Sequence, residues 1–151
     1  MIGETTSTAY TAANTSVTAG GAGDNSAVTG VIIDRAAYNY PQKMTVSFAY
    51  TATLAAGKSL FLKTVLVEHD DASNLGSAAT LATLENGTGT AIATSAGGGT
   101  VTGTQKYNVW IGSAKRYIRL KFTPDMDATG TDTSAISVQV LMGGSYKAPA
   151  V

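Results

Sequence analysis

The chain of 151 residues contains ten basic and ten acidic residues, which gives a formal net charge of zero at pH 7, and it has no cysteine. This length is typical of one domain whose core needs no metal or disulfide to hold it, and a chain without cysteine has neither disulfides nor thiolate chemistry. Proteins that bind nucleic acid through its phosphates usually carry a basic excess, so the charge balance disfavours nucleic acid as a partner.

Charged residues make up only 13% of the chain, about half of the ~25% usual in globular proteins. A surface with so little charge is poorly protected against association. Either much of it is covered when the protein works, or its many threonine and serine side chains alone make it polar enough. No apolar run reaches the roughly 18 residues of a membrane span, and the first residues lack the pattern of a secretory signal, so we expect no membrane partner.

Residues 1–27 differ in composition from the rest of the chain, since Ile2, Tyr10 and Val17 are nearly their only large apolar side chains. Such a segment cannot bury enough surface by itself to offset the entropy lost on ordering. We therefore predict an extended N-terminal arm that a neighbouring subunit or a larger assembly holds in place. The alternative is an edge strand that packs along its own domain. Residues 28–144 form the predicted main domain, and residues 145–151 form a short tail.

The main domain consists of short segments in which apolar and polar residues alternate, the pattern of strands with one buried face. Both faces of the segment 59–69 are apolar enough to predict a central strand, whereas residues 77–85 fit a short helix and a strand equally well. About eight strands separated by turns predict an all-β antiparallel β-sandwich. Eight strands in two sheets is the number in a jelly roll, and the choice of that topology rests partly on the resemblance described below, because one sequence does not give the strand order. The predicted strands cover residues 28–33, 43–52, 59–69, 91–94, 100–102, 107–111, 115–122 and 134–142.

Two acidic segments contain some of the residues of a cation site. His69, the only histidine, lies in the segment 68–71, where neighbouring side chains of a strand point to opposite faces and cannot converge on one ion. Residues 125–132 match the first half of a calcium loop but lack the bidentate glutamate that completes it. We favour polar turns in both segments. We also find no spacing that indicates a catalytic site, so we expect no enzyme activity, no metal or other cofactor and no small-molecule substrate.

Four aromatic residues are candidates for an interface, because exposed tyrosine and tryptophan bury a large area with few rotatable bonds. Tyr10 lies in the predicted arm, and Tyr38 and Tyr40 lie in a loop-like stretch. Trp110 falls on the strand face opposite Val109, and for it packing within the molecule is slightly favoured. The same aromatic side chains could stack on sugar rings, which is the alternative interpretation.

Four charged residues are candidates for structural ion pairs. Asp34 and Arg35 precede a loop, and Arg116 and Arg119 belong to a predicted strand. Arginine presents a planar fork that matches a carboxylate, and Arg116 shares a strand face with apolar residues, so it needs a partner if it is buried. We predict a buried Asp–Arg pair that links distant strands.

The strand pair 107–122, hinged at Gly112, resembles part of the small capsid decoration (cement) proteins of tailed bacteriophages, and the resemblance extends over most of residues 28–144. It implies a jelly-roll-like sandwich that binds the outside of the phage head, bridges major capsid proteins and resists the pressure of the packaged DNA. The implied partners are the major capsid protein and further copies of the chain in a homodimer or homotrimer, and the implied location is the outer surface of the virion. The alternative function is a carbohydrate-binding sandwich of a virion surface or tail fibre. The motifs that carry the resemblance are Ile32-Ile-Asp-Arg35, Tyr38, Ile111-Gly112, Lys115-Arg-Tyr-Ile-Arg119 and Val138-Gln-Val-Leu-Met-Gly-Gly144.

Overall fold

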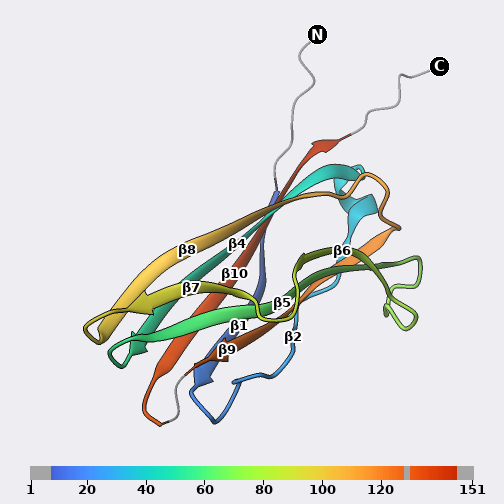
Figure 1. The fold of residues 1–151 in the computed structure, drawn as a ribbon. Coiled ribbons are helices and arrows are strands. Elements are labelled where there is room, and N and C mark those ends of the chain that lie inside the picture. The colour runs from blue at the N-terminus through green and yellow to red at the C-terminus, as the bar shows by residue number, and fades with distance from the viewer. Residues whose placement is uncertain (1–7, 128–129, 146–151) are drawn as a thin grey trace, which may run out of the picture.

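A computed structural model describes residues 8–127 and 130–145, which form a sandwich of two antiparallel β-sheets (Figure 1). We call the two layers sheet A and sheet B. Sheet A contains β1 (Thr8–Thr18), β4 (Pro41–Leu54), β8 (Gly99–Trp110) and β10 (Thr133–Ser145). Sheet B contains β2 (Val28–Thr29), β3 (Ile33–Asp34), β5 (Lys58–Asp70), β6 (Ala79–Glu85), β7 (Thr90–Ser95) and β9 (Tyr117–Met126), and a 3₁₀-helix, η1 (Arg35–Tyr38), follows β3.

The strand order is that of a jelly roll. Sheet A has the order β1-β10-β4-β8, and sheet B has the order β2-β9-β5-β6, with β3 also paired to β9 and β7 also paired to β5. The strands β2 and β3 therefore act as one interrupted strand, and so do β6 and β7. When each interrupted strand is counted as one, β1 pairs with β10, β2–β3 with β9, β4 with β8, and β5 with β6–β7. The first strand thus pairs with the last and the second with the next to last, as in a long hairpin that is rolled up across two sheets. The predicted fold class is confirmed.

The core lies between the sheets and is built from the alternating residues of the strands. Phe48 of β4 and Phe122 of β9 are fully buried and meet edge to face, with ring centres 5.1 Å apart. Aromatic pairs of this kind add to the free energy gained by burial alone. The inward-facing residues of both sheets belong to one continuous apolar cluster, so the two layers depend on each other for their stability.

The N-terminal segment differs from the prediction. Residues 8–18 are the edge strand β1, which pairs along its whole length with β10, and the side chains of Ala12 and Val17 are each only 1% exposed. The arm prediction is therefore wrong for these residues, and residues 1–7 lie outside the described part. The composition misled because an edge strand needs only a few inward side chains when the neighbouring strand pairs with it along its length.

Three other segments refine the prediction. Residues 79–85 form a strand, β6, which settles the ambiguous segment. The separate strands expected at 100–102 and 107–111 are one strand, β8, that runs through Gly103. The strand expected at 28–33 is interrupted between β2 and β3. Among the described residues, no helix is long and apolar enough to span a membrane.

Side chains and backbone close both open sides of the sandwich. On the β8 side, the Tyr50 hydroxyl donates to the carbonyl oxygen of Ile92 in β7. Gly103 makes room for this contact, since a Cβ there would lie 2.3 Å from the Tyr50 hydroxyl oxygen. On the β1 side, the backbone N–H of Val31 donates to the carbonyl oxygen of Ala12 at 2.9 Å.

Candidate interaction surface

The outward face of sheet A is the most unusual surface of the molecule. Its four strands contain no aspartate or glutamate, and Lys43 and Lys106 are their only charged residues. Inward residues alternate with outward ones, so the outward set follows from the register of the sheet. We call this set the sheet A face, and it comprises Thr11, Asn14, Ser16, Thr18, Lys43, Thr45, Ser47, Ala49, Thr51, Thr53, Thr100, Thr102, Thr104, Lys106, Asn108, Trp110, Thr133, Ala135, Ser137, Gln139 and Leu141.

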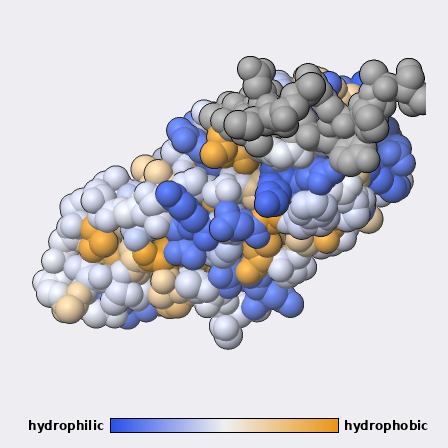
Figure 2. Space-filling view, turned by 90° about the horizontal axis from the view of Figure 1, so that it is seen from above, coloured by the Kyte–Doolittle hydropathy of each residue, from blue (hydrophilic) through white to orange (hydrophobic). Residues whose placement is uncertain are grey.

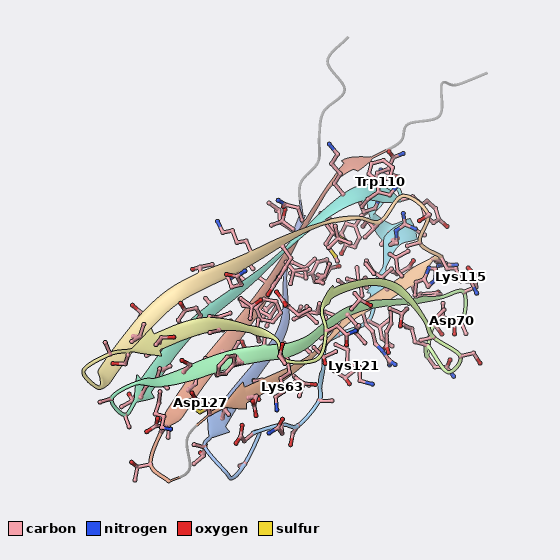
Figure 3. The ribbon with its side chains drawn as sticks, viewed as in Figure 1. Lys63, Asp70, Trp110, Lys115, Lys121 and Asp127 are labelled. Atoms are coloured by element: carbon pink, nitrogen blue, oxygen red, sulfur yellow. The ribbon has the colours of Figure 1, made fainter. Side chains whose placement is uncertain are left out.

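The outward face of sheet B has the opposite character. Its strands carry carboxylates as well as cations, and these form ion pairs across neighbouring strands. Lys63 Nζ lies 3.0 Å from a carboxylate oxygen of Asp125, and Arg119 donates to Glu68 at 2.6 Å. Lys63 and Lys121 lie on this side of the sandwich, away from Trp110 (Figure 3). The uneven distribution of charge between the two faces marks the sheet A face as the candidate interaction surface.

Trp110 is the largest exposed apolar side chain of the sheet A face, with an exposed fraction of 56%. Trp110 therefore does not belong to the core, and the slight preference for packing within the molecule holds only for the ring face that lies on the β8–β9 turn. Its ring lies over the backbone of Gly112, where a Cβ would come within 2.6 Å of the indole. Gly112 thus allows the indole to lie flat on the β8–β9 turn, which holds a large aromatic surface open to solvent.

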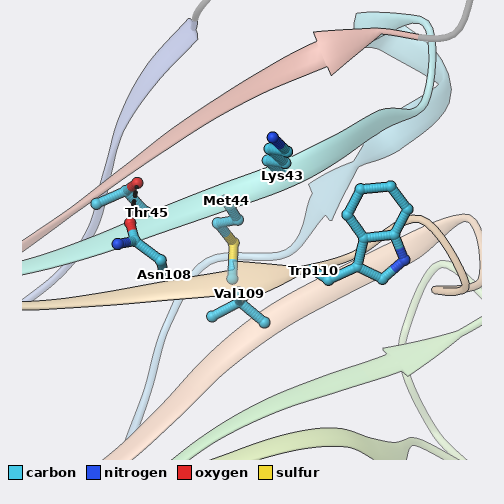
Figure 4. A pocket seen from close by; sticks show the side chains of 6 residues that line it. All are labelled: Lys43, Met44, Thr45, Asn108, Val109 and Trp110. Atoms are coloured by element: carbon cyan, nitrogen blue, oxygen red, sulfur yellow. Dashed lines mark hydrogen bonds between the residues drawn. The ribbon is translucent and has the colours of Figure 1, made fainter.

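A shallow hollow of about 370 Å³ opens beside Trp110, between β4 and β8 (Figure 4). Lys43 and Trp110 occupy neighbouring positions across the two strands, with Thr45 and Asn108 in the next row. The Thr45 hydroxyl donates to the side-chain carbonyl oxygen of Asn108 at 2.8 Å. This end of the face therefore combines an aromatic plane, an ammonium group and a fixed amide.

Further hollows continue along the same face. One lies between β4, β8 and β10, where Lys106, Gln139 and Leu141 line it, and another lies between Ala49 and Ala135. Leu141 is 46% exposed. Seen from above, the surface of the molecule is pale with hydrophobic spots toward one end, and hydrophilic side chains gather near its middle (Figure 2). The surface is thus uneven enough to accept side chains of a partner.

The structure places the tyrosine candidates differently from one another. Tyr10 and Tyr38 pack edge to face with ring centres 5.4 Å apart, and their hydroxyl groups are hydrogen-bonded to each other. Both are half-buried and join β1 to η1, so they contribute mainly to the fold. Tyr40 is exposed, and the Arg35 guanidinium lies 5.6 Å from its ring centre.

Asp34 and Arg116 form the ion pair that links distant parts of the chain. The Arg116 Nε and Nη2 atoms donate to the two carboxylate oxygens of Asp34 at 3.0 and 2.9 Å. The guanidinium lowers the pKa of Asp34, and the carboxylate raises the pKa of Arg116. The pair was expected to be buried, yet the Arg116 side chain is 49% exposed. Arg116 precedes β9, so the alternation of the strand does not extend to it.

Arg35 is the buried arginine instead, with 2% of its surface exposed. Its guanidinium donates to the backbone carbonyl oxygens of Ala114, Lys115 and Pro41 rather than to a carboxylate. Burial lowers the pKa of Arg35. The side chain ties η1 to the start of β4 and to the turn that follows Trp110. Arg119, the last of the candidates, pairs with Glu68 across β5 and β9.

The two acidic segments serve as turns and strand contacts. The His69 Nδ1 atom accepts a hydrogen bond from the backbone N–H of Lys115 at 3.1 Å. In the second segment, Asp127 accepts from the backbone N–H of Ser59, and Asp132 accepts from the backbone N–H of Ala55. Within residues 8–127 and 130–145, no group of three or more potential ligands could hold a metal ion.

Sequence reasoning missed most of the sheet A face, including Lys43, Lys106 and Leu141. A signal was present, since the segments 41–54 and 99–110 contain no acidic residue. The absence of acidic residues indicates a shared surface only once the strand order is known, because that order places the two segments side by side in one sheet.

No protein-family model matches the chain, and no curated protein sequence matches it significantly. Among solved structures, that of infectious bursal disease virus, Gt strain, aligns with 96% of this chain and 35% of its own, at 14% identity and a TM-score of 0.52. The exported protein XepA of PBSX aligns with 95% of this chain and 39% of its own, at 18% identity and a TM-score of 0.47. The chain thus spans well under half the length of these proteins. The similarity to the virus structure shows a shared jelly-roll-like sandwich fold.

Proposed function

We propose that the protein is a structural component of a virus particle, a decoration protein that binds the outside of a tailed-phage head and bridges its major capsid proteins. The observation that carries this proposal is the jelly-roll sandwich fold, which is similar to part of the solved structure of infectious bursal disease virus. The resemblance of the segments 32–35 and 111–119 to capsid decoration proteins supports the same function.

The mechanism follows from binding to the assembled lattice. A protein that binds only the assembled shell stabilises it by mass action, and many copies together resist pressure even when each contact is weak. We propose that copies sit as homodimers or homotrimers on local symmetry axes of the outer surface. The role requires no catalysis, cofactor, nucleic acid or membrane.

Cosedimentation tests this function directly. Purified protein is mixed with bare, expanded capsids assembled from the major capsid protein encoded with this chain, and the pelleted fraction is measured against protein concentration. We expect saturable binding, with imaging that places the protein at fixed symmetry positions. Absence of binding at high protein concentration would refute the decoration function.

A second candidate function is binding of carbohydrate. The observation that favours it is the open indole of Trp110 beside Asn108 and Lys43, because sugars stack on aromatic planes and hydrogen-bond to neighbouring amides. The pairing of Tyr38 with Tyr10 removes Tyr38 from such a site. A glycan array with the wild type and the Trp110→Ala variant tests this function, and loss of a specific glycan signal in the variant would support it.

A further inference from the structure

The distribution of charge leaves the sheet A face without acidic groups. All carboxylates that lie on described strands belong to sheet B, and the cations of that sheet that oppose them, such as Lys63 and Arg119, form ion pairs. In sheet A, Lys43 and Lys106 have no carboxylate on any strand of their own sheet. The face therefore has a weak positive potential and two ammonium groups available to an external anion.

The face also has the apolar anchors that an interface requires. Trp110 and Leu141 are exposed, and the register places them two strands apart in adjacent rows, because Leu141 pairs with Thr45 and Trp110 pairs with Lys43. Tryptophan in particular contributes much of the binding free energy in protein interfaces. The indole lies over Gly112, and a tryptophan side chain has only two rotatable bonds, so little side-chain entropy is lost on binding.

The size of the face matches one side of a stable interface. Four strands about 4.8 Å apart and about 12 residues long, at ~3.3 Å per residue, give a surface of roughly 19 by 40 Å, or about 750 Å². A standard protein–protein interface buries about 800 Å² on each partner. One sheet face is thus large enough for docking without help from the rest of the molecule.

The charge of the face also distinguishes between two kinds of partner. If two copies met through this face, four lysines would be brought together without a carboxylate to balance them, which is unfavourable. A different protein surface that carries carboxylates would pair with both lysines. Docking onto such a surface leaves the outward face of sheet B, with its own ion pairs, exposed to solvent.

We propose that the sheet A face docks onto an acidic surface of the capsid protein, with Trp110 and Leu141 as apolar anchors and Lys43 and Lys106 as charged contacts. This inference rests on the proposed decoration function and adds to it which side of the molecule lies on the shell. The side chains involved are exposed, so they can be changed without disturbing the core.

The test measures binding of variants to the same bare, expanded capsids. The variants are Lys106→Glu, Lys43→Glu with Lys106→Glu, and Trp110→Ala, and the matched control is Lys121→Glu, which makes the same charge change on sheet B. We expect Lys106→Glu to weaken binding about tenfold, and the double variant and Trp110→Ala to weaken it more, because they remove central contacts. Lys121→Glu should bind as the wild type does. Circular dichroism melting curves verify that each variant folds.

Trp110 provides a second measurement, because it is the only tryptophan of the chain. Docking should shift its fluorescence to shorter wavelength as the indole leaves water. Binding should also weaken as salt is raised, since the lysine contacts are screened.

The outcomes separate the inference from the function on which it rests. If the wild type binds but Lys121→Glu weakens binding and the sheet A variants do not, the docking face is wrong and the decoration function stands. If the wild type does not bind capsids, both fail. If Trp110→Ala converts a dimer to a monomer in sedimentation, or abolishes only glycan binding, the occupant of the face is a second copy or a sugar, and the proposal is overturned.

Discussion

Arg35 is a buried cation that neutral acceptors stabilise. Its partners are three backbone carbonyl oxygens from the β8–β9 turn and from the start of β4, with the Tyr40 ring nearby. Ala114 and Lys115 lie outside the strands, so the guanidinium donates to carbonyl oxygens that strand pairing leaves free. The sequence could suggest an arginine partner for Asp34, but only the fold shows that it is Arg116 and that Arg35 points inward.

We expect Arg35→Lys to lower the free energy of unfolding by about 2–3 kcal/mol, because one ammonium group cannot reach all three carbonyl oxygens. Urea denaturation measures the change. The matched control is Arg116→Lys, where the ion pair is half-exposed and the loss of stability should be much smaller than in Arg35→Lys. Equal losses in the two variants would contradict the structural role of Arg35.

Asp34 should make the fold sensitive to acid. The lowered pKa of this carboxyl means that the folded state binds fewer protons than the unfolded state as the pH falls. Its contribution to stability is fully present above the ordinary aspartate pKa of about 3.9 and is lost as the pH drops through the lowered value. Melting temperatures of Asp34→Asn should therefore decrease less on acidification than those of the wild type. Parallel curves for the two proteins would show that the ion pair does not contribute.

At the scale of the element, β1 shows how a weakly apolar segment becomes part of the fold. It hydrogen-bonds to β10 over its length, with a bulge between Thr11 and Ala13, and buries Ala12 and Val17. The fully paired β10 then has no exposed edge to template aggregation. The segment was predicted as an arm because its composition cannot show that β10 offers a partner.

We expect Val17→Asp to destabilise the protein by more than about 3 kcal/mol, because it places an unpaired carboxylate in the core. Ser16→Asp, one residue away on the outward face, should change the free energy of unfolding by less than about 0.5 kcal/mol. Denaturant unfolding of both variants measures the contrast. Two small effects would indicate a loosely attached arm.

At the scale of the whole molecule, the two sheets share one core but present different outer faces. The apolar cluster includes residues of every long strand, whereas the carboxylates of the strands are confined to sheet B. The cluster joins the two sheets through one core, and the uneven charge distinguishes the face that we propose for docking from the opposite face. The net charge of the whole chain is zero and therefore does not reveal the difference in charge between the two sheet faces.

We expect a single unfolding transition, because neither sheet buries its apolar face without the other. Far-ultraviolet circular dichroism and tyrosine signals in the near ultraviolet should give coincident curves. Trp110 fluorescence should change little, since the indole is exposed before unfolding. Two separate transitions would show that the sheets are independent units.

The sequence by itself determined the fold class and most of the strands, although not β1, which was predicted as an arm. Alternation in segments such as 43–52 and 115–122 reflects burial of one face, which is local and periodic and therefore readable along the chain. The apolar faces of 59–69 also indicated a central strand, and β5 has neighbours on both sides. The motifs that resemble those of capsid decoration proteins implied a jelly-roll-like sandwich.

Only the tertiary structure decided which residues form a surface together. The sheet A face joins β1, β10, β4 and β8, and the first and last of these belong to distant parts of the chain. Pairing between distant strands depends on long-range packing, which no local pattern records. The same holds for Trp110, whose exposure depends on the turn at Gly112 beneath it, and for Arg35, whose three carbonyl partners come together only when β4 and the β8–β9 turn meet.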